Sequence, residues 1–439
     1  MWDHIFGFVM EMYRRGPESV TAAVIGVLLG ALMMWQLQRR AAKADAELAT
    51  LKLGRAREIE LELTRQLELS RELELKAREA GRRLINEGTL KDAEIFEQRL
   101  QRQRAERLAA SRKRHLRDLS VQIRQVVDTD GRIWESDVPG DVPRFVPRSD
   151  RRATIVAVIN LKGGVGKTTL SANLSGTFAA RGESVLAVDL DFQHSLSDLC
   201  FTEQQRDELL RHGCLIDRLF EAGGRTTSHL PQWMARVGDS ALRVVVADEG
   251  LETAEERVRA AWLLKESGID ARFLLRAAIH TPAVADEVDW IFLDCPPRLT
   301  TAAVNALCAA DYVLIPTILD AVSSNAVPRL LQWLTRLKHK DRLCPQLELL
   351  GVLANKTHQL KQLTAMEATR WDSLQGQCSP KWPVPIHFFE QFVPSKVDFA
   401  RAAAEARFAI DQSDDIRARF LDLADEIRNR VPQLCKSAT

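Results

Sequence analysis

The stretch Ile159–Leu174, "INLKGGVGKTTLSANL", lies in the middle part of the 439-residue chain and decides the fold. It begins at the end of the apolar run "ATIVAVIN" (153–160), which predicts a buried strand. Glycines at 163, 164 and 166 let successive backbone N–H groups turn toward phosphate oxygens. A helix that opens near Lys167 adds the positive end of its dipole. The order strand, loop and helix therefore predicts a phosphate-binding loop.

Individual side chains of this loop have predicted roles. Lys167 is expected to reach the β- and γ-phosphates, and the Thr168 hydroxyl is suited to bind Mg²⁺. The predicted cofactors are therefore ATP and Mg²⁺. The loop residues expected to contact the nucleotide are Lys162, Gly163, Gly164, Val165, Gly166, Lys167, Thr168 and Thr169.

Two further apolar runs end in acidic residues. "SVLAVDLDFQHSLS" (184–197) places Asp189 and Asp191 at the end of one predicted strand, and "DWIFLDCPPRLT" (289–300) places Asp294 at the end of another. Ligands of parallel sheets bind at the carboxyl ends of the strands, so these acids are expected beside the phosphate site. An exposed acidic turn is the alternative for Asp189 and Asp191.

The run "KGGVGKTT" (162–169) resembles the deviant Walker A motif of the ParA/MinD family of P-loop ATPases, in which an additional lysine precedes the glycines. Lys162 matches that lysine. The resemblance implies that Lys162 reaches across an ATP-bound homodimer to the phosphates held by the other subunit. Lys162, Lys167 and Asp191 are then the expected catalytic residues.

The same resemblance implies further roles and covers about residues 153–431. Asp191 would orient the attacking water, and Thr168, Asp189 and Asp294 would hold or support Mg²⁺. Asn355 and Pro394 occupy positions where the family contacts adenine. The second motif departs from the family's D-x-D-P-Q-G, because Phe192 replaces proline and His194 replaces glycine. These replacements affect the expected rate of hydrolysis more than binding.

Residues 153–432 are expected to form one ATPase domain with a doubly wound, mostly parallel α/β sheet, followed by a tail at 433–439. Further strand-like runs begin at Asp311, Leu347 and Val384. The helix expected at 413–431 has Ser413 as its cap and an apolar face that predicts packing on the domain. That face consists of Ile416, Phe420, Leu423 and Ile427.

The first part of the chain has a different texture. Residues 19–38 contain no charge and match, at about 20 residues, the length of a single transmembrane helix. A buried helix is the alternative; a cleaved signal is disfavoured because Asp3 and Glu11 precede the run. Residues 1–18 are expected to be amphipathic or disordered. Because nucleotide is cytoplasmic, the expected location is the inner membrane, with the ATPase domain in the cytoplasm.

Residues 39–127 lack proline and predict a helical coiled-coil stalk, and residues 128–152 predict a Pro/Gly linker. The basic part of the stalk, 99–117, suits DNA or anionic lipid, or is simply a solvated face. The chain as a whole has a net charge of +1, so bulk charge does not indicate nucleic acid. Its seven cysteines form no C-x-x-C pair, which argues against a zinc site.

These features together predict a membrane-anchored ATPase that pairs on ATP and signals its nucleotide state to a protein partner that stimulates hydrolysis. An ATP-binding scaffold with little turnover is the alternative. A tyrosine-kinase-like protein is a weaker one, because the two tyrosines, Tyr13 and Tyr312, form no C-terminal cluster. Non-specific DNA binding is a separate hypothesis. It rests on Arg401, Arg407, Arg417, Arg419, Arg428 and Arg430.

Overall fold

The computed structural model describes residues 102–103, 106, 110, 133–135, 137–138, 142–221, 227–263, 269–320, 326–340, 342–359 and 362–437. The predicted N-terminal segment (1–18), the transmembrane helix (19–38) and nearly all of the predicted stalk (39–127) lie outside these residues. Within the described part of the chain, no helix combines the length and apolar character that crossing a membrane requires.

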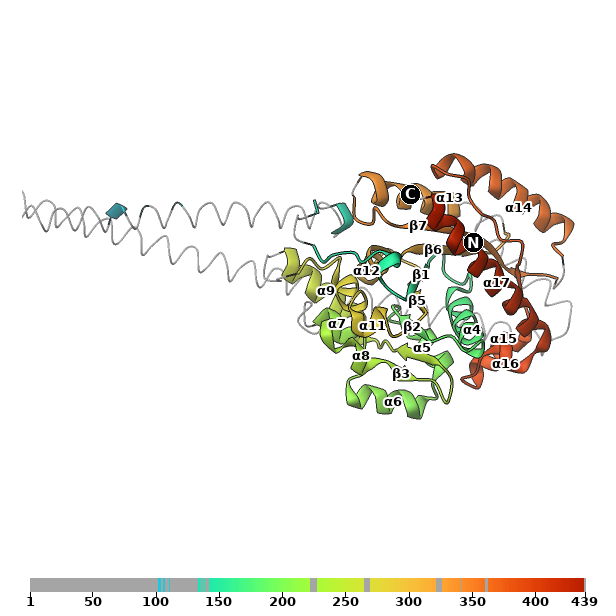
Figure 1. The fold of residues 1–439 in the computed structure, drawn as a ribbon, viewed down its shortest axis with the longest axis horizontal. Helices are drawn as coiled ribbons and strands as arrows, with labels where there is room; N and C mark the ends of the chain where they lie inside the picture. The colour runs from blue at the N-terminus through green and yellow to red at the C-terminus, as the bar shows by residue number, and fades with distance from the viewer. Residues whose placement is uncertain are drawn as a thin grey trace, which may run out of the picture. The chain divides into compact units, whose positions relative to one another are not determined.

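One eight-stranded sheet organises the described residues, with strand order β3-β4-β2-β5-β1-β6-β7-β8 (Figure 1). Neighbouring strands of this described sheet run parallel, apart from the antiparallel pair β3 and β4. The mostly parallel sheet predicted from the sequence is therefore confirmed. The strands are β1 (Thr154–Val158), β2 (Val185–Asp189), β3 (Ala235–Arg236), β4 (Leu242–Val245), β5 (Trp290–Asp294), β6 (Tyr312–Thr317), β7 (Glu348–Thr357) and β8 (Val393–Pro394).

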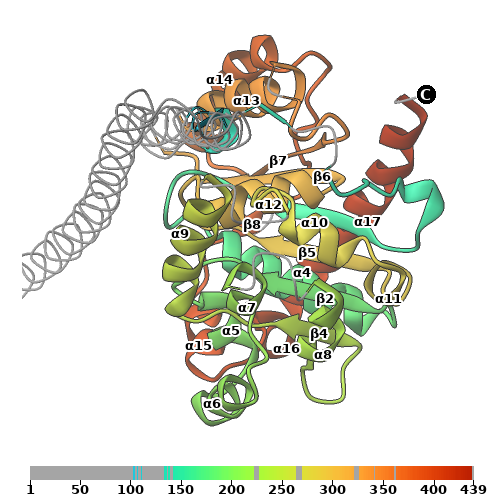
Figure 2. The same ribbon diagram turned by 90° about the vertical axis from the view of Figure 1, so that its left-hand side faces the viewer.

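Helices cover both faces of the sheet (Figure 2). Side chains alternate along β1, so Ile155 joins the hydrophobic core on one face and Val156 the core on the other. On the face of Val156 lie α4 (Lys167–Ala180) and α17 (Asp414–Ser437); on the face of Ile155 lie α10 (Leu274–Ile279), α12 (Thr301–Ala309) and α13 (Ala326–Thr335). This is the doubly wound arrangement that alternating strands and helices predict.

The remaining helical segments complete the two layers and the rim. They are α5 (Ser195–Cys200), α6 (Glu203–His212), α7 (Asp217–Glu221), α8 (Leu230–Trp233), α9 (Gly250–Leu263), α11 (Pro282–Ala285), α14 (Ala365–Cys378), α15 (Val397–Ala404) and α16 (Ala409–Gln412). The short 3-10 segments are η1 (Ile133–Glu135), η2 (Arg148–Asp150), η3 (Thr227–His229) and η6 (Ser379–Lys381), and the π-helical segment η5 (Arg336–Lys340) directly follows α13.

The C-terminal helix follows the sequence prediction. Helix α17 begins directly after Ser413, and Ile416, Phe420, Leu423 and Ile427 are all buried against the core that α4 shares. Its apolar face therefore packs on the domain.

The strand expected from Val384 is not formed. Phe388 makes an isolated bridge with Val352, and the paired strand β8 lies further on, at Val393–Pro394. Prolines at 383 and 385 lack backbone N–H groups, which prevents a regular ladder there. The antiparallel pair β3–β4 was not predicted.

Residues 142–150, which belong to the predicted linker, lie against the domain. The backbone N–H of Val146 donates to Nδ1 of His280 (3.1 Å), and Nε of Arg151 donates to the carbonyl of Val146 (2.9 Å). The Phe145 ring lies 4.6 Å from the His280 ring, and Val142 packs on the core. We call residues 142–150 the strap.

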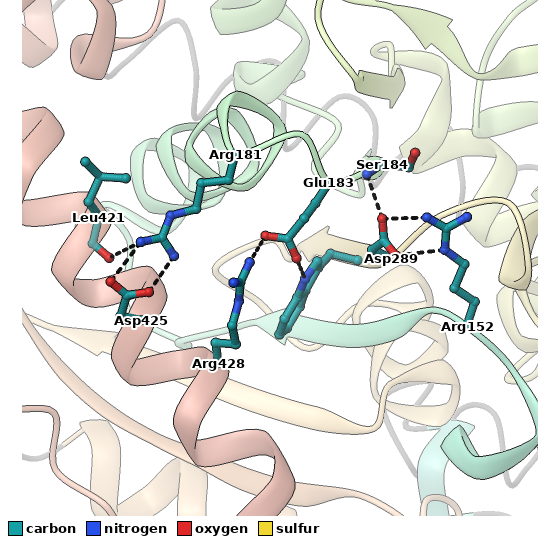
Figure 3. A network of polar contacts seen from close by, with 9 residues as sticks. Arg152, Arg181, Glu183, Ser184, Asp289, Leu421, Asp425 and Arg428 are labelled. Atoms are coloured by element: carbon teal, nitrogen blue, oxygen red, sulfur yellow. Dashed lines mark hydrogen bonds and ion pairs between the residues drawn. The ribbon is translucent and has the colours of Figure 1, made fainter.

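A polar network joins α17 to the starts of β2 and β5 (Figure 3). Arg181 holds Asp425 at 2.6 and 2.8 Å, and Arg428 pairs with Glu183, which also accepts a 2.7 Å hydrogen bond from Nε1 of Trp290. Arg152 binds both oxygens of Asp289. The network lies at the edge of the sheet where β2 and β5 start. The predicted site residues lie at the opposite edge, where these strands end.

Candidate functional site

The loop between β1 and α4 has a backbone that requires glycine. Gly164 and Gly166 adopt φ of +77° and +83°, in the left-handed region that L side chains rarely occupy. A Cβ on Gly166 would lie 2.5 Å from Nδ2 of Asn355, so a side chain does not fit there. Gly166, the N-cap residue of α4, therefore packs closely against Asn355, and a helix N-terminus that follows a glycine loop is a common phosphate site.

An open cleft of about 500 Å³ lies over this loop. Among the predicted site residues, the cleft brings together the loop, the start of α4 and one acid from the end of β2. Its lining is Gly163, Gly164, Gly166, Lys167, Thr168, Thr169, Asp191, Gln193, Ser195, Asp198, Leu199, Pro297, Lys356 and Ala403. The other predicted residues, Lys162, Val165, Asp189, Asp294, Asn355 and Pro394, lie outside that lining.

Lys167 is buried at the start of α4, and its Nζ donates to the carbonyl of Lys162 at 3.2 Å. Burial lowers the pKa of Lys167, and the charge of Asp294 opposes that shift. The ammonium therefore sits inside the curve of the loop, beside the phosphate cradle.

Asp294 stands at the end of β5, fully buried. Burial first, and then the charge of Asp189, raise its pKa to about 7, while the Thr168 and Ser171 hydroxyls and Lys167 oppose the rise. Ser171 donates to Oδ1 at 3.0 Å, but Oδ2 has no hydrogen-bond partner among the described residues. A buried carboxylate oxygen without a partner, next to a threonine hydroxyl, fits Mg²⁺.

No group of three or more His, Cys, Asp or Glu side chains able to hold a metal occurs in the described parts of the chain. Magnesium in phosphate-transfer sites commonly uses one or two protein oxygens, with phosphate and water completing the shell. The pair Thr168 and Asp294 matches that pattern, and a cage of protein ligands does not form here.

Asp189, at the end of β2, faces inward and holds the following turn. Its Oδ2 accepts hydrogen bonds from the backbone N–H (2.9 Å) and hydroxyl (2.7 Å) of Ser197, and its Oδ1 accepts one from the Asp191 N–H at 3.2 Å. Burial raises its pKa to about 6. Asp191 lines the cleft instead, and its Oδ1 accepts from the Gln193 N–H at 3.1 Å.

Lys162 sits beside the loop rather than in the cleft lining. Its Nζ lies 3.2 and 3.3 Å from the two carboxylate oxygens of Asp320, which follows β6. Its backbone N–H donates to the side chain of Asn160 at 3.0 Å. The two lysines therefore lie in different surroundings: Nζ of Lys162 contacts Asp320, whereas Nζ of Lys167 contacts the loop carbonyl of Lys162.

Asn355 and Pro394 lie at the end of β7 and in β8. The Asn355 amide donates to the carbonyl of Val165 at 2.7 Å, so in this structure it supports the phosphate-binding loop. Pro394 is buried opposite Thr357 in the β7–β8 pair. Lys356, which follows Asn355, lines the cleft and was missed by the sequence reasoning, although its place at a strand end was a usable signal.

Other site residues were also missed. Ser171 and Ser197 bond to the two buried acids, and the lining residues Gln193, Ser195, Asp198, Leu199, Pro297 and Ala403 were not named. Those at 193–199 directly follow an acidic strand end, which marks them in the sequence. Ala403 comes from α15, and nothing in its local sequence singles it out.

A family model described as an AAA domain matches residues 153–349. The chain is 33% identical over 221 residues to a putative replication protein A of Sinorhizobium fredii, covering 49% of this chain and 51% of that protein. It is 31% identical over 202 residues to the chromosome partitioning protein ParA of Caulobacter vibrioides, covering 45% of this chain and 68% of that protein. The chain belongs to the ParA family.

A solved structure agrees with the fold of this ParA-family chain. Apo McdA of Cyanothece superposes with a TM-score of 0.51 at 18% identity, covering 64% of this chain and 99% of that one. At that identity the likeness shows the fold alone. The chain spans about half to two thirds of the length of the first curated relatives that it matches, at 51% and 63%.

Proposed function

We propose that this ParA-family chain is an ATPase that takes ATP and Mg²⁺ and hydrolyses the γ-phosphate. The observation that carries the proposal is the unpartnered buried Oδ2 of Asp294 beside Thr168, the residue that follows the glycine loop and its Lys167, in a loop that admits no Cβ at Gly166. A purely structural acid would be expected to have all its oxygens satisfied. Together these groups fit a magnesium nucleotide.

The roles follow from position. Backbone N–H groups of the loop at 163–166 and of the first turn of α4 bind phosphate oxygens, and Lys167 neutralises their charge. Mg²⁺, when bound, supplies further neutralisation and is held by Thr168 and Asp294. Asp191 faces the cleft and orients the attacking water, while Asp189 fixes the turn that carries it.

Pairing of two domains on ATP is part of the same proposal. Lys162 lies outside the lining of its own cleft and contacts Asp320. In the proposed dimer it contacts instead the phosphates bound by the second subunit. A protein partner that stimulates hydrolysis and reads the nucleotide state completes the proposal. The family relative from Caulobacter is named as a chromosome partitioning protein, so positioning or segregation of a complex is the proposed setting.

The proposed location is the inner membrane, with residues 19–38 as a single-pass anchor and the ATPase domain in the cytoplasm. Support comes from the uncharged run and from the cytoplasmic supply of nucleotide. Residues 39–127 are proposed to form the coiled-coil stalk between them.

Non-specific DNA binding is supported less well by the arginines named for it. Arg401, Arg417 and Arg428 contact Asp398, Asp414 and Glu183 of the same domain. Such internal pairs compete with phosphate for the guanidinium groups. A salt-dependent affinity for DNA that requires ATP would support this role.

A scaffold with little turnover is the second candidate. It is favoured by His194, which adopts φ +44° where the family's glycine would be unstrained. Burial of the Tyr312 side chain in β6 argues against its phosphorylation, and kinase action on another protein stays the weaker alternative.

The test compares wild-type protein with Lys167→Ala. Wild type is expected to bind ATP in a Mg²⁺-dependent manner and to turn it over, and Lys167→Ala is expected to lose both. Lys396→Ala, which removes the half-buried partner of the exposed Asp415, is the matched control and should behave as wild type. Binding without turnover, even with candidate partners, would favour the scaffold; no binding would refute the proposal.

A further inference from the structure

Two loops approach each other beside the cleft, and a cation–π contact joins them. The first is the turn Asp191–His194 after β2, and the second is the segment Cys295–Thr300 after β5. The guanidinium of Arg298 lies 5.2 Å from the centre of the Phe192 ring. Phe192 is one of the two residues that depart from the family motif, so this contact belongs to this chain's own version of the site.

The second loop lies directly on the phosphate cradle. Pro297 lines the cleft, and a Cβ on Gly163 would lie 3.9 Å from Cβ of Pro297. Arg298 is the next residue along the chain. Its partner Phe192 likewise follows a lining residue, Asp191. The guanidinium thus lies beside two loops that each contribute a neighbouring residue to the cleft lining, while Arg298 and Phe192 themselves lie outside that lining.

The present partners of Arg298 hold it weakly. Besides the Phe192 ring, it pairs with Glu252 of α9 at 3.3 Å, and the two side chains are 58% and 54% exposed. Exposed ion pairs and exposed cation–π contacts are both worth little. A phosphate group offers arginine a bidentate, charge-assisted partner, which is stronger than either.

We propose that Arg298 is a catalytic residue of the ATPase, leaving Phe192 and Glu252 to contact the γ-phosphate. The inference rests on the proposed function. A guanidinium at this place neutralises charge that develops on the transferred phosphoryl group, as arginines supplied to other P-loop enzymes do. Phe192 and the exposed Glu252 then hold the guanidinium next to the site through contacts weak enough to be exchanged for a phosphate.

The alternative is that Arg298 only ties the two loops together. The two models predict different effects of removing Phe192 or Glu252 on ATP binding and turnover. If the contact ties the loops, removing either partner has the same effect. If Phe192 and Glu252 merely store the guanidinium, removing them leaves Arg298 available, while removing Arg298 deletes the charge from the γ-phosphate.

The experiment measures ATP and ADP affinity by competition with a fluorescent nucleotide, and steady-state turnover, in the full chain. Arg298→Ala is expected to weaken ATP binding about 10-fold with ADP binding unchanged, and to lower kcat about 100-fold. Arg298→Lys keeps the charge but not the bidentate geometry and should fall between. Phe192→Leu, which keeps an apolar side chain, and Glu252→Gln should retain the wild-type ratio of ATP to ADP affinity and a kcat at least as high as wild type.

Two results would overturn the assignment while the proposed function stands: an unchanged affinity ratio and kcat in Arg298→Ala, or a loss in Phe192→Leu as large as in Arg298→Ala. The affinity ratio decides the matter even when basal turnover is very slow. A wild-type protein that binds neither nucleotide overturns the proposed function, and the role of Arg298 with it.

Discussion

Asp189 and Asp294 occupy paired positions at the ends of the adjacent strands β2 and β5, and both are fully buried. Burial raises the pKa of Asp189 to about 6 and that of Asp294 to about 7. Two carboxyl groups so close together disfavour each other's ionisation. At neutral pH the two buried charges therefore destabilise the folded domain, and a cation bound between them would relieve that destabilisation.

Replacing Asp294 with Asn should separate stability from function. The pKa of Asp294 in the folded protein lies above the ordinary 3.8, so the free energy of unfolding of the wild type falls as the pH rises from about 4 to 7. At pH 8 without nucleotide, Asp294→Asn should be more stable than wild type by about 2 kcal/mol, measured by urea unfolding. The same variant should lose the Mg²⁺ dependence of ATP binding. A variant that is less stable at pH 8 and still responds to Mg²⁺ would contradict this prediction.

Gly166→Ala should abolish nucleotide binding. It combines a left-handed φ of +83° with a clash at 2.5 Å against Asn355, so the loop must shift. Gly182→Ala is the matched control, because Gly182 has φ of +84° with nothing within 4 Å of its Cβ. The control should lose about 1 kcal/mol of stability from backbone strain and keep full binding in calorimetry. Equal binding by both variants would show that the contact with Asn355 does not shape the loop.

His280 should make the domain acid-sensitive. Burial, followed by the charges of Arg151 and Arg276, lowers its pKa to about 4, against hydrogen bonds with Ala309 and Val146. A depressed folded pKa means that stability is complete above pH 6.5 and falls as the pH drops toward 4. The loss should reach about 3 kcal/mol in urea titrations at a series of pH values. His280→Gln cannot titrate, and the difference between wild type and variant should shrink over that range; a constant difference would contradict the prediction.

Lys162→Ala should retain ATP binding and lose ATP-induced dimerisation. The side chain contacts Asp320 at the rim and not the lining of its own cleft, so its removal should change the affinity of a monomer little. Light scattering with and without ATP measures the dimer, and Lys396→Ala again serves as control. ATP-dependent pairing in Lys162→Ala would contradict the proposed sandwich.

Deleting residues 1–38 should release the protein from membranes without changing ATP affinity. The uncharged run at 19–38 is proposed to be the anchor, and the cleft is built entirely from residues beyond 160. Fractionation of cells that express each form measures the release. A truncated protein that remains with the membrane would place the attachment elsewhere.

The phosphate-binding loop and the acids at strand ends could be predicted because local sequence determines them. Glycines at 164 and 166 allow the left-handed backbone conformation of the loop, and apolar runs followed by aspartate mark the ends of strands. The orientation of each acid could not be predicted. Asp189 turns inward because Ser197, eight residues away, offers it two donors, whereas Asp191 has its own turn to cap.

Contacts between distant parts of the chain account for the other differences. Asn355 meets the loop carbonyl of Val165 across 190 positions, which no local pattern reveals. The cation–π contact of Arg298 with Phe192 depends likewise on two loops that lie far apart in the sequence and follow different strands of the sheet. The expected strand at 384–388 failed for a reason that was visible in the sequence, since two prolines flank Val384.

The strap has a mechanical consequence. Arg276 of α10 donates to the carbonyls of Cys308 and, in the strap, of Pro143, and His280 joins Val146 to Ala309. A pull on the chain before residue 142 would thus be transmitted first to the end of α12, whose other end adjoins the loop carrying Arg298. Tension would reach the loop that carries Arg298 along α12, and it would also reach the start of strand β1, because Nε of Arg148 in the strap donates to the Thr154 hydroxyl at 2.6 Å.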